Sequence, residues 1–267
     1  MWVVKMKYLR LYRFYFSKNV KSRLSYRLDA FIGIFGFLIE NIILFSTLYL
    51  TVSTIPSLGG WDINMLGFLY GYYLIPKSID HIFSDNVWQL ANGGITRGLL
   101  DKYLIRPLNP LFQLIAEMVQ FEGLGEFILG IVLLIIYTPL VAVNWSFMNI
   151  LLMILCATFA TIFFFSIKLF FGSMSFWTKR SIEVMTLVYD FSNFAKYPIG
   201  IFNQIIRIVL TFIIPFSVVI FLPVEALLLN TNLYLATLYT FLASFIMLLV
   251  SLFLWKKGLG KYESAGS

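Results

Sequence analysis

Charge, cysteine and histidine are all scarce in this chain of 267 residues. Charged residues make up 12% of it, whereas a typical soluble domain has about 25%. The one cysteine excludes an internal disulfide and any metal site built from several cysteines, and the one histidine excludes centres built from several histidines. No G-x-x-x-x-G-K-[ST] motif occurs, so the chain has no P-loop to bind nucleotide phosphates.

Long apolar stretches dominate the sequence instead. Hydrophobic residues make up 60% of it, and the mean hydropathy is +0.87. A helix that crosses a bilayer needs about 20 mostly apolar residues. Stretches of this kind lie near 30–53, 62–83, 119–142, 148–172 and 233–255. The composition therefore predicts an all-α integral membrane protein.

The positions of the basic residues predict how the chain crosses the membrane. Lys and Arg are concentrated before the first span, after the second and fourth spans, and after the last span. The connections near 54–61, 138–147 and 223–232 carry none. Because basic connections stay on the cytoplasmic side, we expect a multi-pass protein of the cytoplasmic membrane with both termini in the cytoplasm. The net charge of +7 then reflects orientation and lipid headgroups rather than nucleic acid.

The apolar region 182–222 is too long for one straight crossing, and Pro198, Gly200 and Pro215 interrupt it. Four earlier crossings return the chain to the cytoplasm, so this region can cross only once if the last span is to end inside. We expect 182–198 to be the fifth of six spans. Residues 201–222 would then form a re-entrant or interfacial hairpin on the outer side, and a spanning helix over 199–222 is the alternative.

Residues 1–29 mix Lys and Arg with Leu, Tyr and Phe at helical spacing. Tyr8, Leu11 and Tyr15 can share one face of such a helix, while the basic residues lie elsewhere. This pattern predicts an interfacial helix that lies along the inner headgroup layer, with membrane lipid as its partner. A contact with another protein is an alternative that is compatible with the first.

The connection 84–117 is long for a loop between bundled helices, which usually has about 2–8 residues. We expect Thr96 to cap a short amphipathic helix within it. The predicted apolar stripe of this helix consists of Leu99, Leu100, Tyr103 and Leu104. Such a helix suits docking into a groove of another protein, and a linker on the headgroup layer is equally compatible. The candidate partner-binding residues are Ile95, Thr96, Arg97, Leu99, Leu100, Asp101, Tyr103, Leu104, Arg106 and Pro107.

Ionisable residues inside apolar spans cost about 2.5–3.5 kcal/mol each on insertion scales and usually serve a function. The candidates for a polar translocation path are Glu40, Glu126, Asp190, Lys196 and Arg207. A structural role is the competing interpretation, which we favour because intramembrane ions usually pair with one another. Under that interpretation, Glu40 or Asp190 pairs with Lys196 or Arg207.

Other ionisable residues are expected to be peripheral. Lys77, Asp80 and His81 at the end of the second span, together with Lys168, would snorkel or line the interface. His81 has no Ser–Asp arrangement near it, and Cys156 lies in an apolar span. We therefore predict no catalytic residue and no metal ligand.

Three stretches of the chain resemble a known family. They are GITRGLLDKYLIRPLNP at 94–110, FAKYPIGIF with IPFSVVIFLP at 194–223, and WKKGLGKYESAGS at 255–267. They are similar to ABC-2 type exporter permeases, in the small six-helix branch of that family. The resemblance implies a single transmembrane domain over 1–267 with an N-terminal interfacial helix, a cytoplasmic coupling helix between spans two and three, and an outer re-entrant hairpin between spans five and six.

The resemblance also implies partners. A separate ATP-binding subunit, present in two copies, would bind ATP and Mg, so that this chain needs no cofactor and is not itself an enzyme. A second, related permease would complete a heterodimer, with a homodimer as the alternative. An ion-coupled carrier that uses Glu40, Glu126 and Asp190 is the rival function; such carriers usually contain internal repeats, and the sequence has no evident repeat.

Overall fold

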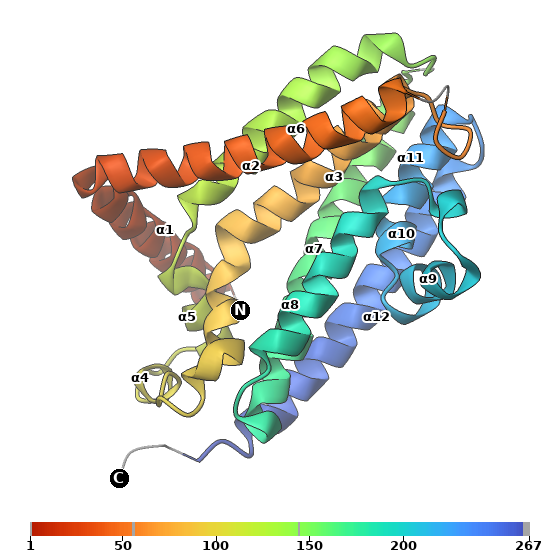
Figure 1. Cartoon of the computed structure of the whole chain (residues 1–267). Coiled ribbons are helices and arrows are strands. Elements are labelled where there is room, and N and C mark those ends of the chain that lie inside the picture. Colours follow the sequence, from red (N-terminus) through yellow and green to blue (C-terminus); the bar gives the residue numbers. More distant parts are fainter. Residues whose placement is uncertain (1, 55–56, 144, 264–267) are drawn as a thin grey trace.

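The computed structural model of the chain describes residues 2–54, 57–143 and 145–263, with side chains from Tyr8 onward. Every regular element in these ranges is a helix (Figure 1). The seven longest are α1 (Trp2–Ser25), α2 (Arg27–Ser53), α3 (Ile63–Ser84), α6 (Leu124–Tyr137), α7 (Phe147–Thr178), α8 (Ile182–Phe191) and α12 (Leu233–Leu259). The predicted all-α class is therefore confirmed; the last four residues of the C-terminal motif, 264–267, lie outside the described residues.

Four helical stretches are long and apolar enough to cross a membrane: Arg27–Ser53, Phe121–Leu140, Phe147–Thr178 and Leu233–Leu259. They coincide with four of the predicted spans, and the chain is a membrane-integral protein. The other two predicted spans fall on α3 and α8. The helix α3 has 22 residues and carries Lys77, Asp80 and His81, whereas α8 has 10 residues and continues as a 3-10 turn over Ser192–Lys196.

The long helices pack into one bundle. The helix α7 packs along α12, and α3 packs against both α6 and α7, while α2 crosses α6 on the outside (Figure 1). Aromatic side chains fill the centre, where Tyr70, Tyr73, Phe163, Phe164 and Phe216 are fully buried. Two short helices, α4 (Asp101–Leu104) and α5 (Pro110–Glu117), lie at the same end of the bundle as the last turns of α12. The helix α11 (Phe221–Leu228) lies at the opposite end.

Region 201–222 is broken into short helical pieces. The helix α9 (Gln204–Ile208) runs into a π turn over Val209–Ile213, and α10 (Phe216–Val219) follows. The break comes at Ile214, whose backbone is not helical (φ −130°, ψ 82°), before Pro215. Phe216 then packs against Phe163 of α7 with the ring centroids 5.3 Å apart. No continuous helix therefore covers 199–222, and which part of 182–222 crosses the membrane stays a prediction.

A close contact between α2 and α6 depends on Gly125. A Cβ atom on Gly125 would lie 2.2 Å from the carbonyl oxygen of Ile34, so the two backbones leave no room for a side chain. We expect Gly125→Val to lower the free energy of unfolding by about 1–3 kcal/mol, because overpacking forces the helices apart. Gly36→Val is the matched control, since a Cβ there meets nothing within 4 Å. Thermal unfolding in detergent, followed by circular dichroism, measures both, and equal effects would contradict the contact.

Candidate functional site

A cavity of about 210 Å³ lies beside the second half of α3. Five parts of the chain contribute to its wall: α2, α3, the start of the 84–117 connection, α6 and α8. The residues that line it are Phe37, Glu40, Lys77, His81, Asp85, Trp88, Glu126 and Tyr189. Most of the surrounding bundle is apolar, so this concentration of charge marks the cavity as the candidate site.

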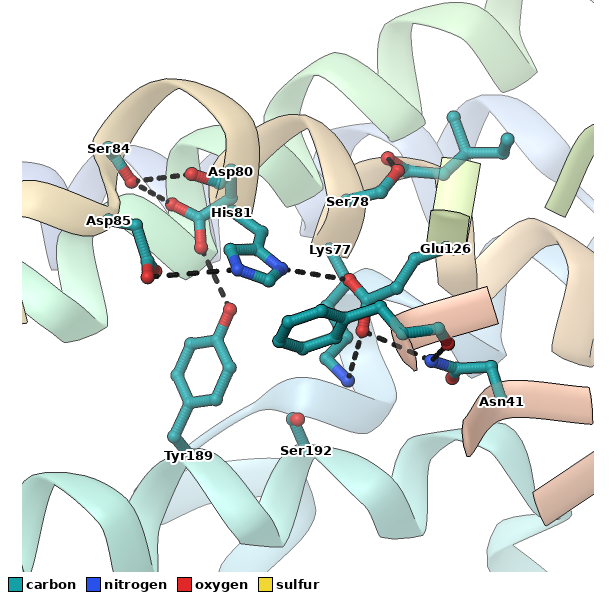
Figure 2. Close-up of polar contacts among 12 residues, drawn as sticks. Asn41, Lys77, Ser78, Asp80, His81, Ser84, Asp85, Glu126, Tyr189 and Ser192 are labelled. Carbon is teal, nitrogen blue, oxygen red and sulfur yellow. Dashed lines mark hydrogen bonds and ion pairs between the residues drawn. The ribbon is translucent and has the colours of Figure 1, made fainter. Parts of the chain in front are cut away.

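Glu126 of α6 is the centre of the polar contacts at this cavity (Figure 2). Its carboxylate lies 3.3 Å from the Nζ atom of Lys77 and 3.3 Å from the Nδ1 atom of His81. The side-chain amide of Asn41 donates to the same carboxylate at 3.3 Å. Lys77 and His81 are four residues apart on α3 and so share one helix face. Because Glu126 is only 2% exposed, it needs these partners to remain charged.

A second group of charges lies deeper in the bundle. The Nζ atom of Lys168 on α7 lies 2.8 Å from Asp80 and 2.9 Å from Asp85, and the side chains of Lys168 and Asp80 are both 0% exposed. The hydroxyl of Tyr189 on α8 donates to Asp80 at 2.9 Å (Figure 2), and Ser84 donates to it as well. The prediction that Lys168 and Asp80 snorkel or line the interface is therefore wrong, because a buried pair compensates both charges inside the bundle.

The predicted path residues separate into two sets. Glu40 and Glu126 both line the cavity, whereas Asp190 and Arg207 are exposed and do not line it. Lys196 is buried, with its Nζ atom 5.0 Å from the ring centroid of Tyr70.

Among the residues that the structure describes, neither Glu40 nor Asp190 forms an ion pair with Lys196 or Arg207. The predicted pairing partners are therefore wrong, although intramembrane charges do pair. Sequence reasoning placed Lys77, His81 and Lys168 at the periphery and left out Asp85, Trp88 and Tyr189. The spacing of Lys77, His81 and Asp85 at successive intervals of four is the available signal, because it places all three on one side of a helix and of the turn that follows it.

The connection 84–117 is more broken than predicted. It begins with a 3-10 turn over Asp85–Val87 and a π turn over Leu90–Gly94. Gly98 has a left-handed backbone (φ +69°), which ends any helix there, and α4 begins only at Asp101 and has four residues. The predicted cap is wrong, because the hydroxyl of Thr96 donates to the carbonyl of Gly93 rather than accepting from a following amide.

Most of the predicted apolar stripe, but not Leu104, faces the chain's own core. Leu100 and Tyr103 are 0% and 1% exposed. The hydrophobic cluster that buries them includes Leu114 of α5, Leu169 of α7 and Trp255 of α12. The 84–117 connection is therefore fixed to the ends of α7 and α12.

Two tyrosine hydroxyls reinforce this attachment. Tyr103 donates to Glu117, and Tyr262 donates to Asp101 at 2.9 Å. Burial and the Glu117 carboxylate raise the pKa of Tyr103 above its usual range, and burial together with Asp101 raises the pKa of Tyr262 to about 12. Both hydroxyls therefore keep their protons, and remain donors, at physiological pH.

The exposed part of the connection overlaps the predicted partner-binding residues only in part. Ile105 is 82% exposed and Leu104 is 46% exposed, although both are large apolar residues. Other exposed residues of the connection include Arg97, Lys102, Arg106 and Pro107. We call Leu104, Ile105 and these four residues the basic apolar patch.

Comparison with known proteins gives one family. The family model described as ABC-2 family transporter protein matches residues 35–266, which include every residue of the cavity and of the 84–117 connection. No curated protein matches the chain.

Proposed function

The chain belongs to the ABC-2 family of transporter proteins, and from that premise we propose that it is the transmembrane permease subunit of an ATP-driven exporter. The chain is a membrane transport component, and the family match over 35–266 is the observation that carries the proposal. It would move its substrate across the cytoplasmic membrane. ATP and Mg would be bound by a separate subunit, since this sequence has no P-loop.

The proposed topology has six crossings, made by α2, α3, α6, α7, α8 with the turn after it, and α12. Both termini and the 84–117 connection would be cytoplasmic, and 201–222 would form a re-entrant segment on the outer side. Two features support this arrangement. Lys and Arg are concentrated in the parts of the chain that this topology places on the cytoplasmic side. In addition, α4, α5 and the end of α12 lie together at one end of the bundle (Figure 1).

The helix α1 would lie along the inner headgroup layer. Its contacts with the α5 region support this position, because Asn19 donates to the carbonyl of Glu117 at 3.1 Å and Arg23 pairs with Glu122 at 2.8 Å. These contacts hold α1 beside the 84–117 connection, where its other face can contact lipid.

We place the contact with the ATP-binding subunit at the basic apolar patch. An isoleucine that is 82% exposed outside the proposed spans, in a connection rich in basic residues, suits a groove of a partner protein. Leu100 and Tyr103, although predicted to bind the partner, would instead fix the patch to the bundle. Two copies of the ATP-binding subunit would serve two permeases.

The basic apolar patch and the cavity are connected by a short stretch of chain, so a displacement of the patch can be transmitted to the cavity wall. Asp85 and Trp88 line the cavity, and they also begin the connection that carries the patch. The hydrophobic cluster around Leu100 links the same connection to α7 and α12. A displacement of the connection by the ATP-binding subunit would therefore change the cavity wall directly.

A second permease is proposed to cover α2. This helix buries only three side chains, Asn41, Leu48 and Val52, and Glu40 is exposed near its middle. A carboxylate in contact with lipid at this depth would cost about 2.5–3.5 kcal/mol, so the Glu40 face requires protein or water. A related permease in a heterodimer would supply it, as would a second copy of this chain.

Purification of the full-length chain from its own membranes in mild detergent tests the proposal. We expect a P-loop ATPase and a second permease to co-purify, with ATP hydrolysis in the same fraction. The contact of Glu126 with His81 is the observation that favours the ion-coupled carrier instead. A chain that purifies alone, and transports on a proton gradient without nucleotide, would establish the carrier and overturn the exporter.

A further inference from the structure

Most of the charged groups in or behind the wall of the cavity are paired. The carboxylates there are Glu40, Asp80, Asp85 and Glu126. Lys77, Lys168 and His81 are the basic side chains that pair with them. The ion pairs account for Asp80, Asp85 and Glu126, whereas Glu40 forms none within the described residues.

Glu40 is therefore the carboxylate that is available to a ligand. It is exposed on α2, and its side chain lines the cavity. Among the described residues Lys196 forms no ion pair with Glu40, and the Nζ atom of that lysine lies 5.0 Å from the ring centroid of Tyr70 instead. A cation that enters from the α2 side meets Glu40 without having to break an existing ion pair.

Aromatic rings form the remainder of the wall. The rings of Trp88 and Tyr189 lie edge to face with centroids 5.5 Å apart, and Phe37 lies edge to face with His81 at 4.7 Å. Aromatic faces attract cations through their quadrupole, by about 0.5–2 kcal/mol for each contact. The ring of Tyr189 already has the Nζ atom of Lys168 at 5.5 Å from its centroid. Trp88 and Phe37, which line the same cavity as Glu40, are therefore the rings suited to an ammonium group on an apolar body.

We propose that this cavity is a binding site for a cation in which an ammonium group is attached to an apolar or aromatic body. The ammonium group would lie between Glu40 and the ring of Trp88, with the apolar part toward Phe37. The proposal rests on the proposed function, for which it names the substrate class. The ammonium group could belong to a free small molecule or to a lipid headgroup, and these sources are distinguished below.

The test is the binding of benzyltrimethylammonium to the full-length chain in nanodiscs of an uncharged glycolipid, which neither attracts the cation nor repels an anion, measured by titration calorimetry. We expect it to bind at least about tenfold more tightly than benzylsulfonate, an anion of similar size. Glu40→Gln should weaken the binding of the cation about tenfold, which corresponds to about 1.4 kcal/mol. Trp88→Leu should weaken it several-fold through loss of the cation–π contact. Glu183→Gln is the matched control, because Glu183 is an exposed carboxylate paired with Arg180 away from the cavity.

Two outcomes would overturn the proposal: equal affinity for the cation and the anion, or an unchanged affinity in Glu40→Gln. Nanodiscs that also contain phosphatidylethanolamine identify the source of the ammonium group. Competition from that lipid assigns the site to a headgroup, and an unchanged affinity assigns it to a free cation. The assay contains no ATP-binding subunit, so its failure leaves the exporter proposal standing.

Discussion

Lys168→Met is expected to lower the free energy of unfolding by about 3–5 kcal/mol, because it leaves Asp80 buried and charged without its partner. Lys168 and Asp80 are both 0% exposed, with 2.8 Å between their charged atoms. A buried carboxylate that loses its counter-ion must be protonated or must draw in water, and both distort the packing of α3 against α7. Thermal and denaturant unfolding in detergent measure the loss.

A second variant separates the charge from the shape of the side chain. The double variant Lys168→Met with Asp80→Asn removes both charges, and we expect it to recover most of the lost stability, since a buried pair can often be replaced at little net cost. Lys256→Met, at an exposed lysine near the end of α12, should change stability by less than about 0.5 kcal/mol. If Lys168→Met were as mild as this control, the buried pair would not exist in the folded protein.

Ile105→Asp is expected to reduce ATP-driven transport and association with the ATP-binding subunit by at least about thirtyfold, which corresponds to a hot-spot residue of about 2 kcal/mol or more. The side chain is 82% exposed, so a carboxylate there costs the isolated chain little stability. Ile105→Val should retain both activities. Co-purification of the ATP-binding subunit and ATP-dependent uptake into reconstituted vesicles are the two measurements.

Leu100→Asp distinguishes a binding residue from one that supports the fold. Leu100 is fully buried against the chain's own cluster, so this variant should fail to accumulate as folded protein in the membrane. If Leu100→Asp folded normally and lost only the ATP-binding subunit, the stripe expected from the sequence would be the docking face after all. In that case the basic apolar patch would lose its proposed role.

The transmembrane helices could be predicted from the sequence because hydropathy is a local property. Twenty or so apolar residues are enough to define α2, α7 and α12, whatever packs beside them. The partners of charged residues could not be predicted in the same way. Glu126 meets Lys77 and His81 only because α6 packs against α3, and no spacing within a single helix encodes that contact.

The 84–117 connection shows a second limit. Its alternation of charge with Leu, Ile and Tyr indicates that one face is covered, but not what covers it. The cluster that covers Leu100 and Tyr103 includes Leu169 of α7 and Trp255 of α12, far away in the sequence. The left-handed backbone at Gly98 could not be predicted either. A glycine in an amphipathic pattern can equally continue a helix or end it.

The most direct test of the central claim is to label a cysteine at position 105. Cys156, the one native cysteine, is buried and is replaced by Ala, so that Ile105→Cys carries the only thiol. We expect a membrane-impermeant maleimide to leave this thiol unlabelled on intact cells and to label it after permeabilisation. We also expect a thiol cross-linker to join the thiol to a P-loop ATPase. Labelling from outside intact cells would contradict the account, because the patch would then lie where no ATP-binding subunit can reach it.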